Sequence, residues 1–187
     1  GINVSKTIHE LGGTSIATGF LGGNAGKTIE NVLNERNIKN DFIWVEGETR
    51  TNTKVFEENG EVTELNEPGP VIGEEQLKAL MDKLEAYADE NALFILAGSI
   101  PSGVDKQIYA DIIRLVHAKG AKVLLDADGD LFRNTLDAVP DMIKPNRVEL
   151  EEYAGIDYRS SDEEILNLAR ELLGRGIDTV AVSMGKS

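Results

Sequence analysis

Three residues at alternate positions could together bind a phosphate ester. Arg50, Asn52 and Lys54 stand in a stretch that is otherwise acidic. If this stretch is a β-strand, its alternate side chains share one face, so a guanidinium, an amide and an ammonium converge there. The planar fork of Arg and the compact charge of Lys both suit phosphate oxygens. The alternative is pairing with neighbouring glutamates, since surface ion pairs are common and weak, and the spacing alone favours it.

A second group of chemically capable residues lies between a short predicted strand and a predicted helix. Lys144, Asn146 and Glu149 occupy the sequence Lys-Pro-Asn-x-x-Glu. Asn146 can cap the helix while Glu149 completes a capping box. Alternatively, the carboxylate and the amide could hold hydrated Mg²⁺, a hard cation that keeps several waters, with Lys144 close to phosphates. This motif alone leaves both interpretations open.

Other familiar site patterns are absent from the sequence. Gly185-Lys186-Ser187 does not end a P-loop, because that motif requires a glycine where Val180 stands. A dinucleotide-binding G-x-G-x-x-G is not formed by the glycines at 19, 22, 23 and 26. His9 and His117 lie far apart on helical patterns, which favours helix-surface packing over a metal or triad role.

An alternation of short β-rich runs and amphipathic helical runs must position these residues. Such an alternation is typical of βαβ units around a mostly parallel sheet. The clearest helix is 74–88, whose apolar residues follow the i, i+3, i+4, i+7 spacing. Strand 92–97 is continuously apolar, as in strands buried on both faces. The other predicted helices cover 3–11, 25–36, 105–119, 130–138, 147–154 and 161–174, and the other strands cover 14–20, 121–126, 142–144 and 178–183.

Residues 42–66 interrupt this alternation. They show no helical periodicity and are typical of short strands with a hairpin turn at Asn59-Gly60, a strong short-range turn signal. A β insertion of this size cannot build its own core. We therefore expect 42–66 to be a β lid that covers an active site, pairs with a partner chain, or does both. The remaining, partial α/β core then comprises 1–41 and 67–187.

The amino-acid composition limits which partners and which cellular compartment fit this chain. The chain has 187 residues, and 19 Lys and Arg against 33 Asp and Glu give a formal net charge of −14. This acidic balance argues against nucleic acid or an anionic membrane surface as the main partner. The sequence holds no cysteine, which excludes disulfides, thiolate catalysis and cysteine-based zinc sites and fits a cytoplasmic location. No apolar run approaches the roughly 18–20 residues that span a bilayer.

Five segments, taken in order, resemble the motifs of the PfkB (ribokinase-like) carbohydrate kinases, and the resemblance covers essentially the whole chain. Gly1–Val4 is similar to the end of the Gly-Gly-Lys-Gly-x-Asn sugar-binding motif, and Gly19–Gly26 to a second glycine-rich segment. Gly98–Gly103 is similar to a Gly-Ser-Leu-Pro-x-Gly turn. Lys144–Glu149 matches the Lys-Pro-Asn and Asn-x-x-Glu elements, and Ser183–Gly185 matches a nucleotide-loop Ser-x-Gly. Each motif is weak alone, but five in the family's order and spacing are strong.

Within the family, residues 47–54 and 63–70 are most similar to the 1-phosphofructokinases, with tagatose-6-phosphate kinases and minor 6-phosphofructokinases as close relatives. The resemblance implies a ribokinase-like three-layer α/β sandwich with a mostly parallel central sheet and a small β lid, incomplete at both ends. It implies ATP-dependent phosphorylation of a sugar phosphate by the full-length protein, with fructose 1-phosphate giving fructose 1,6-bisphosphate. The alternatives are tagatose 6-phosphate or fructose 6-phosphate as substrate, or a fragment that binds sugar phosphate without catalysis.

The resemblance also implies roles for individual residues. The sugar phosphate would be bound by Asn3, Arg50, Asn52, Lys54 and Ser99. The nucleotide, ATP, would be faced by Lys144, Asn146, Ser183 and Gly185. Mg²⁺ and its waters would be ordered by Glu149 and Asp126.

The departures from the family pattern are at the two ends. The family's first strand, with a sugar-binding Asp, and its Gly-x-Gly-Asp motif, whose Asp is the general base, have no counterpart in this chain. We therefore expect an internal fragment, with the general base beyond Ser187 and no turnover by these residues alone. A lid that pairs with a second copy would make the protein a homodimer.

Overall fold

The computed structural model describes residues 2–57, 61–156 and 160–185. The chain divides into two compact units. One consists of Gly1–Leu80 with Ile100–Val104, and the other consists of Met81–Ser99 with Asp105–Ser187. The chain therefore passes from one unit to the other within α3 (Glu74–Tyr87), after Ser99, and again after Val104.

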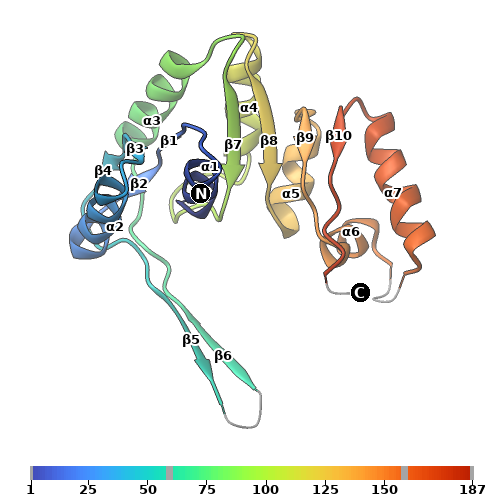
Figure 1. Ribbon diagram of the computed structural model, residues 1–187, viewed down its shortest axis with the longest axis horizontal. Helices are drawn as coiled ribbons and strands as arrows, with labels where there is room; N and C mark the ends of the chain where they lie inside the picture. The colour runs from blue at the N-terminus through green and yellow to red at the C-terminus, as the bar shows by residue number, and fades with distance from the viewer. Residues whose placement is uncertain (1, 58–60, 157–159, 186–187) are drawn as a thin grey trace. The chain divides into compact units, whose positions relative to one another are not determined.

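The first unit combines helices with short parallel strands. Before α3 its elements are α1 (Ile2–Glu10), β1 (Ile16–Ala17), β2 (Phe20–Leu21), α2 (Gly23–Glu35), β3 (Lys39–Asn40), β4 (Ile43–Trp44), β5 (Asn52–Phe56) and β6 (Val62–Asn66) (Figure 1). Strand β1 pairs in parallel with β3, and β2 pairs in parallel with β4. Ala17, Leu33 and Ile38 form a buried apolar core beneath these strands. The short strands are thus held by side chains from β1, from α2 and from Ile38, which directly precedes β3.

The predicted strand 14–20 is broken at Gly19. This residue has φ +137°, a conformation that L side chains rarely adopt. On one side of the break the Thr18 hydroxyl donates to the Asp41 carbonyl at 2.6 Å. On the other side the Ile43 N–H donates to the Gly19 carbonyl at 2.9 Å. The strand therefore bends at Gly19 and changes its partner from β3 to β4.

Strands β5 and β6 form an antiparallel hairpin, as the sequence predicts. Their register runs from Asn52 opposite Asn66 to Phe56 opposite Val62. The turn predicted at Asn59-Gly60 lies outside the described residues. Figure 1 shows the hairpin extending away from α2 and the short paired strands of its unit. Strand β4 also falls within 42–66 but pairs with β2, so the hairpin itself begins at β5.

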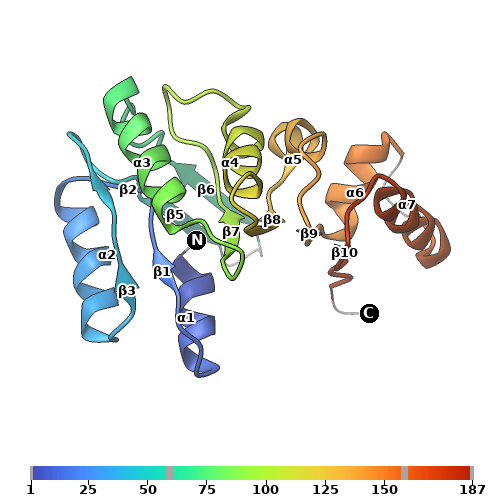
Figure 2. The ribbon, with the colours of Figure 1, turned by 90° about the horizontal axis from the view of Figure 1, so that it is seen from above.

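The second unit is built on a parallel four-stranded sheet. After the end of α3 its elements are β7 (Leu93–Ala97), α4 (Ile108–His117), β8 (Lys122–Asp126), α5 (Gly129–Leu136), β9 (Met142–Ile143), α6 (Arg147–Ala154), α7 (Asp162–Gly174) and β10 (Thr179–Val180). The strand order is β10-β9-β8-β7, and all pairs are parallel. Figure 2 shows α4 and α5 on one side of these strands. The predicted α/β class with a mostly parallel sheet is confirmed.

The core of the second unit is formed by the sheet and the apolar faces of its helices. Val123 and Leu125 of β8 are completely buried, and so are Ile113 of α4 and Leu172 of α7. Burial of such side chains contributes about 1.5–3 kcal/mol each, which outweighs the weak intrinsic preferences of short strands. Helix α4 begins at Ile108 rather than at the predicted residue 105. None of the helices in the described ranges is long and apolar enough to cross a membrane.

Candidate functional site

The carboxyl ends of β8 and β9 bring Asp126 and Lys144 together. Asp126 is the last residue of β8, and Lys144 follows β9 directly. The parallel register pairs Leu125 with Ile143, and the Lys144 N–H donates to the Leu125 carbonyl at 3.0 Å. As a result the Lys144 Nζ lies 3.0 Å from Asp126 Oδ1. Both side chains remain partly exposed, so the ammonium is fixed by a neighbouring charge and still faces solvent.

Ser183 is held beside the Lys-Pro-Asn segment, although β10 is shorter than predicted. The Ser183 N–H donates to the Pro145 carbonyl at 3.0 Å. In return the Arg147 N–H donates to the Ser183 carbonyl at 3.2 Å. These bonds form an isolated parallel bridge between Asn146 and Ser183. Gly185, two residues further on, is exposed and has φ +73°.

Asn146 and Glu149 form the predicted capping box of α6. The Glu149 N–H donates to Asn146 Oδ1 at 2.9 Å. The Glu149 carboxylate in turn accepts from the Asn146 N–H at 2.8 Å and from the Asn146 side-chain amide at 2.6 Å. The structural interpretation of the motif is therefore confirmed. The same bonds hold the carboxylate in a defined position at the edge of the sheet.

Ser99 follows the edge strand β7 on the same side of the sheet. Ala97, the last residue of β7, is paired in the register with Asp126. Gly98 has φ +99°, which turns the chain sharply before the exposed Ser99. Five of the six predicted nucleotide and metal residues therefore lie at one edge with Ser99: Asp126, Lys144, Asn146, Glu149 and Ser183.

Tyr109 is a residue of this edge that the sequence analysis missed. Its hydroxyl donates to the Gly98 carbonyl at 3.2 Å. Burial and the negative charge of Asp126 raise the pKa of Tyr109 to about 12. The phenol is therefore neutral and able to donate at any physiological pH. The available signal was a tyrosine in the first turn of an amphipathic helix that follows a glycine-rich turn.

The predicted phosphate-binding residues lie in the first unit, and the structure brings two of them onto one face. Asn52 and Lys54 belong to β5 and are two residues apart, so they share a face of the hairpin. Arg50 precedes β5, so the predicted strand alternation does not extend to it. An added Cβ at Gly69 would lie 3.3 Å from the Arg50 Cβ, so the chain after β6 packs closely against Arg50. Arg50, Asn52 and Lys54 are all exposed.

The base of the hairpin is attached to the second glycine-rich segment. The Glu48 carboxylate accepts from the N–H groups of Asn24 and Ala25, at 3.1 and 3.2 Å. These bonds at the N-terminus of α2 lower the pKa of Glu48. A Cβ at Gly22 would lie only 2.5 Å from the Gly47 carbonyl oxygen, and one at Gly23 only 2.2 Å from the Glu48 carboxyl carbon. Glycine is therefore required at both positions for this contact.

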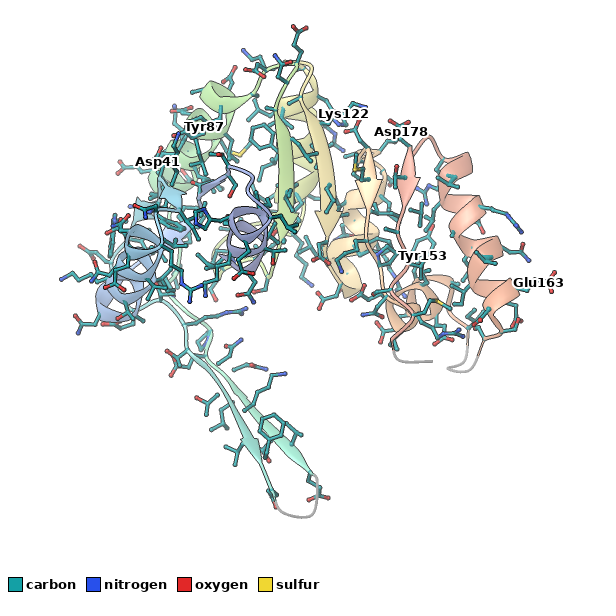
Figure 3. All side chains as sticks on the ribbon, in the orientation of Figure 1. Asp41, Tyr87, Lys122, Tyr153, Glu163 and Asp178 are labelled. Carbon is teal, nitrogen blue, oxygen red and sulfur yellow. The ribbon has the colours of Figure 1, made fainter. Side chains whose placement is uncertain are left out.

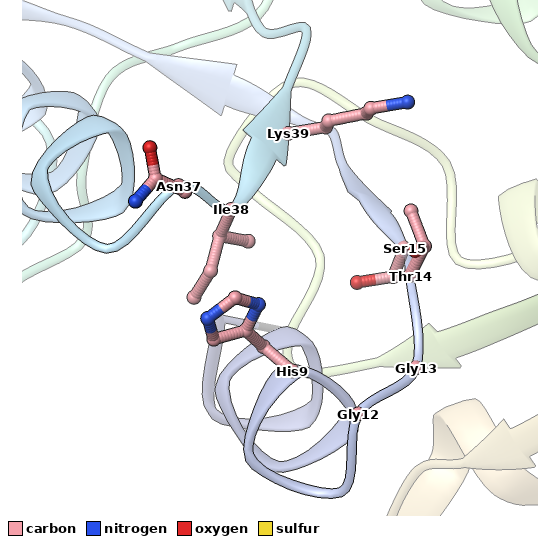
Figure 4. A pocket seen from close by; sticks show the side chains of 8 residues that line it. All are labelled: His9, Gly12, Gly13, Thr14, Ser15, Asn37, Ile38 and Lys39. Carbon is pink, nitrogen blue, oxygen red and sulfur yellow. The ribbon is translucent and has the colours of Figure 1, made fainter.

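Asn3, the remaining predicted substrate residue, lies in the first turn of α1 and is exposed. The same unit has a cavity of about 320 Å³ whose lining includes His9, Ser15, Asn37 and Lys39 (Figure 4). None of the predicted site residues lines it. It lies where β1 and β3 begin, whereas open α/β sheets bind ligands at the carboxyl ends of their strands. The cavity is therefore separate from the candidate site.

The amino ends of the second sheet carry a different group of charges. The His117 Nε2 donates to Asp141 Oδ2 at 2.8 Å, and the Val123 N–H donates to the same oxygen at 2.8 Å. Lys122 lies 3.6 Å from Asp178, and Figure 3 labels both side chains. These contacts tie strand ends together at the edge opposite Asp126, so we assign them to stability.

Metal ligation by side chains alone is not supported by the described part of the chain. It contains no group of three or more His, Asp or Glu side chains that could hold a metal ion. Asp126 pairs with Lys144, and both carboxylate oxygens of Glu149 accept hydrogen bonds from Asn146. Two oriented carboxylates at one edge fit a hydrated Mg²⁺ that takes most of its ligands from water and phosphate.

Comparison with known proteins places this geometry in context. The model of the pfkB family carbohydrate kinases matches residues 1–187. The 1-phosphofructokinase of Borreliella burgdorferi is 36% identical over 185 residues, which are 99% of this chain and 59% of the relative. The D-tagatose-1-phosphate kinase of Bacillus licheniformis is 34% identical over 186 residues, which are 100% of this chain and 60% of the relative.

A solved structure is similar to this chain in its fold. The tetrameric inhibited form of phosphofructokinase-2 from Escherichia coli superposes with a TM-score of 0.87 at 25% identity. The match covers 99% of this chain and 61% of that structure. The chain thus spans about three fifths of the length of these proteins.

Proposed function

Because this chain belongs to the pfkB family of carbohydrate kinases, we propose that the protein carrying it transfers the γ-phosphoryl group of ATP to fructose 1-phosphate. The products are fructose 1,6-bisphosphate and ADP. One observation carries the proposal beyond the family match. Lys144, Asp126, Asn146 and Ser183 converge at the carboxyl edge of a parallel sheet, where such folds bind their ligands. The identity of the sugar phosphate is supported by relatives that are named 1-phosphofructokinase.

The nucleotide is bound at this carboxyl edge. Lys144 contributes a positive charge for phosphate oxygens, and its pairing with Asp126 keeps the ammonium in place before ATP arrives. Asn146 and Ser183 stand side by side through their backbone bridge and face the nucleotide together. Gly185, with its positive φ, lets the backbone turn close to the ligand.

Two carboxylates of this edge would serve a Mg²⁺ ion that accompanies the nucleotide phosphates. Glu149 and Asp126 would hold the water ligands of the ion. Side chains of the described residues do not form a complete coordination shell, so water and phosphate would supply the other ligands. When bound, the ion neutralises charge on the phosphate oxygens during transfer. The contribution of this chain is to orient those two carboxylates.

The sugar phosphate is bound by the predicted substrate residues Asn3, Arg50, Asn52, Lys54 and Ser99. Asn52 and Lys54 share one face of the hairpin, and Arg50 stands just before it with its stem against Gly69. These three groups hold the phosphate already present on the sugar, while Asn3 and Ser99 hydrogen-bond sugar hydroxyls. Phosphoryl transfer requires little covalent chemistry from a protein, so catalysis rests on positioning and on charge stabilisation.

The other face of the hairpin supports a homodimer. Strand alternation puts Thr53, Val55, Thr63 and Leu65 together on it. Val55 is 45% exposed and Leu65 is 58% exposed, and an isolated two-stranded hairpin is marginally stable in water. We propose that this face packs against the same face of a second copy, while the Asn52 and Lys54 face meets the substrate.

As a kinase that consumes ATP and sugar phosphates, the protein is proposed to act in the cytoplasm.

A coupled assay of ADP release tests the substrate. The purified full-length protein that carries this chain is supplied with MgATP and with fructose 1-phosphate, tagatose 1-phosphate or fructose 6-phosphate in turn. The proposal predicts the highest kcat/KM for fructose 1-phosphate. A higher value for tagatose 1-phosphate would favour the second candidate, which the B. licheniformis relative supports. Tight binding of the sugar phosphates without any ADP release would instead show a binding protein and overturn the kinase proposal.

A further inference from the structure

The turn after β7 determines where Ser99 lies relative to the Asp126–Lys144 pair. Ala97 pairs in the register with Asp126, so Gly98 and Ser99 follow directly beside the carboxylate that holds Lys144. Ser99 is also the last residue of the second unit before the chain passes to the first. A small change in the backbone at Gly98 therefore moves Ser99 relative to the Asp126–Lys144 pair.

A side chain from α4 fixes the backbone at this point. The Tyr109 hydroxyl donates to the Gly98 carbonyl at 3.2 Å. Tyr109 stands in the first turn of α4, which is anchored by the buried side chains of Ile108, Ile112 and Ile113. Glycine backbone can adopt many conformations. The hydrogen bond therefore fixes Gly98 to a helix that packs in the core.

The state of the phenol suits this role. Burial, with a smaller effect of the Asp126 charge, raises its pKa to about 12, so the hydroxyl keeps its proton and donates throughout the working pH range.

We propose that Tyr109 is a positioning residue for phosphoryl transfer, which holds the Gly98 carbonyl and thereby sets Ser99 beside the Asp126–Lys144 pair. The inference rests on the proposed function, because Ser99 matters to turnover only if it contacts the sugar phosphate. Tyr109 itself touches neither substrate. It acts through the turn, so its loss affects the use of the sugar phosphate and leaves ATP binding intact.

Steady-state kinetics of Tyr109→Phe test this proposal. The variant keeps the ring and loses only the hydroxyl. One neutral hydrogen bond is worth about 0.5–1.5 kcal/mol, so kcat/KM for the sugar phosphate falls by roughly 2- to 12-fold while KM for ATP stays unchanged. Tyr153→Phe is the matched control, since the Tyr153 hydroxyl, in the last turn of α6, accepts from Arg175 at 2.7 Å. This control leaves both parameters unchanged.

A double-mutant cycle separates positioning from general damage. In a Ser99→Ala background the effect of Tyr109→Phe on kcat/KM shrinks to less than about 2-fold, because the group that Tyr109 positions is gone. Additive effects, or equal losses for Tyr109→Phe and Tyr153→Phe, would overturn the inference while leaving the kinase proposal in place. Absence of turnover by the unmodified protein with every sugar phosphate would overturn both.

Discussion

Lys144 Nζ lies 3.0 Å from Asp126 Oδ1 at the carboxyl edge of the second sheet. The two residues end neighbouring parallel strands, so the register of β8 and β9 fixes their distance. For the proposed binding of phosphate by Lys144 this pairing matters, because a long side chain otherwise loses much conformational freedom when it binds. Asp126 holds the ammonium in place in advance, at the cost of competing with the phosphate for it.

Replacing Lys144 by Met should weaken the binding of ATP. The side chain is partly exposed, so the loss lies near the lower end of the about 1.5–3 kcal/mol for hydrogen bonds to charged groups, which is roughly a 10-fold rise in KM for ATP. The matched control is Lys119→Met, because Lys119 forms a similar, partly exposed pair with Glu85 at 2.9 Å and lies between the end of α4 and the start of β8, at the amino side of the sheet. Equal KM values for ATP in the two variants would refute the assignment of Lys144.

Glu149→Gln should reveal whether this carboxylate serves Mg²⁺ as well as the helix cap. The chain offers a matched control in Glu164→Gln, since Ser161 and Glu164 form a second capping box at α7. Both variants should lower the melting temperature slightly, because each keeps one accepting oxygen. Only Glu149→Gln should raise the Mg²⁺ concentration needed for half-maximal activity. A Mg²⁺ titration of the ATPase or kinase rate checks this, and identical curves would leave Glu149 with a capping role only.

Asp141 should make the stability of the second unit depend on pH. Burial alone would raise the pKa of Asp141, but hydrogen bonds from Val123 and His117 and nearby positive charge outweigh it and lower the pKa from its ordinary value of 3.8. A lowered pKa means that the stabilisation is complete above the unfolded value and is lost as the pH falls through the folded value.

Urea unfolding of Asp141→Asn measures that contribution. At pH 7 the free energy of unfolding should fall by about 1–2 kcal/mol, and the difference from the unmodified protein should shrink towards pH 3. Asp178→Asn is the control, because its pair with Lys122 is exposed and should contribute less than about 1 kcal/mol. A loss that does not change with pH would contradict the ionic origin of the effect.

The prediction of a homodimer can be tested on the face of the hairpin that carries Val55 and Leu65. Val55→Asp places a charge on that face, so the protein should sediment as a monomer at concentrations where the unmodified protein is a dimer. Phe56→Ser is the control on the opposite face, where Phe56 is 75% exposed. Dissociation by both variants would point to loss of the hairpin itself, and an unchanged dimer with Val55→Asp would exclude this interface.

The alternation of helices and strands could be predicted from the sequence because it is a local pattern. The capping box at Asn146 and Glu149 is equally local, since its partners are three residues apart, and the structure confirms it. Lys144 and Asp126 were also predicted to be site residues. Their pairing could not be predicted, because it depends on the register of β8 and β9, which a local sequence pattern does not determine.

The remaining differences arise from non-local hydrogen bonds. Strand 14–20 breaks at Gly19 because neighbouring backbone groups bond to two different strands. Tyr109 was missed because its partner, the Gly98 carbonyl, is brought to it only by the packing of α4. Glu48 was missed for the same reason, since it caps a helix that begins far earlier in the sequence. Side chains that act through distant backbone groups carry no short sequence signature.

The most direct test of the central claim is the identity of the product. The purified full-length protein that carries this chain is incubated with MgATP and fructose 1-phosphate, and the reaction is followed by phosphorus NMR. The account predicts that a second sugar phosphate ester signal grows in step with ADP, as expected for fructose 1,6-bisphosphate. Release of ADP and inorganic phosphate without a new ester would contradict it, and so would consumption of ATP only with a sugar phosphate of another class.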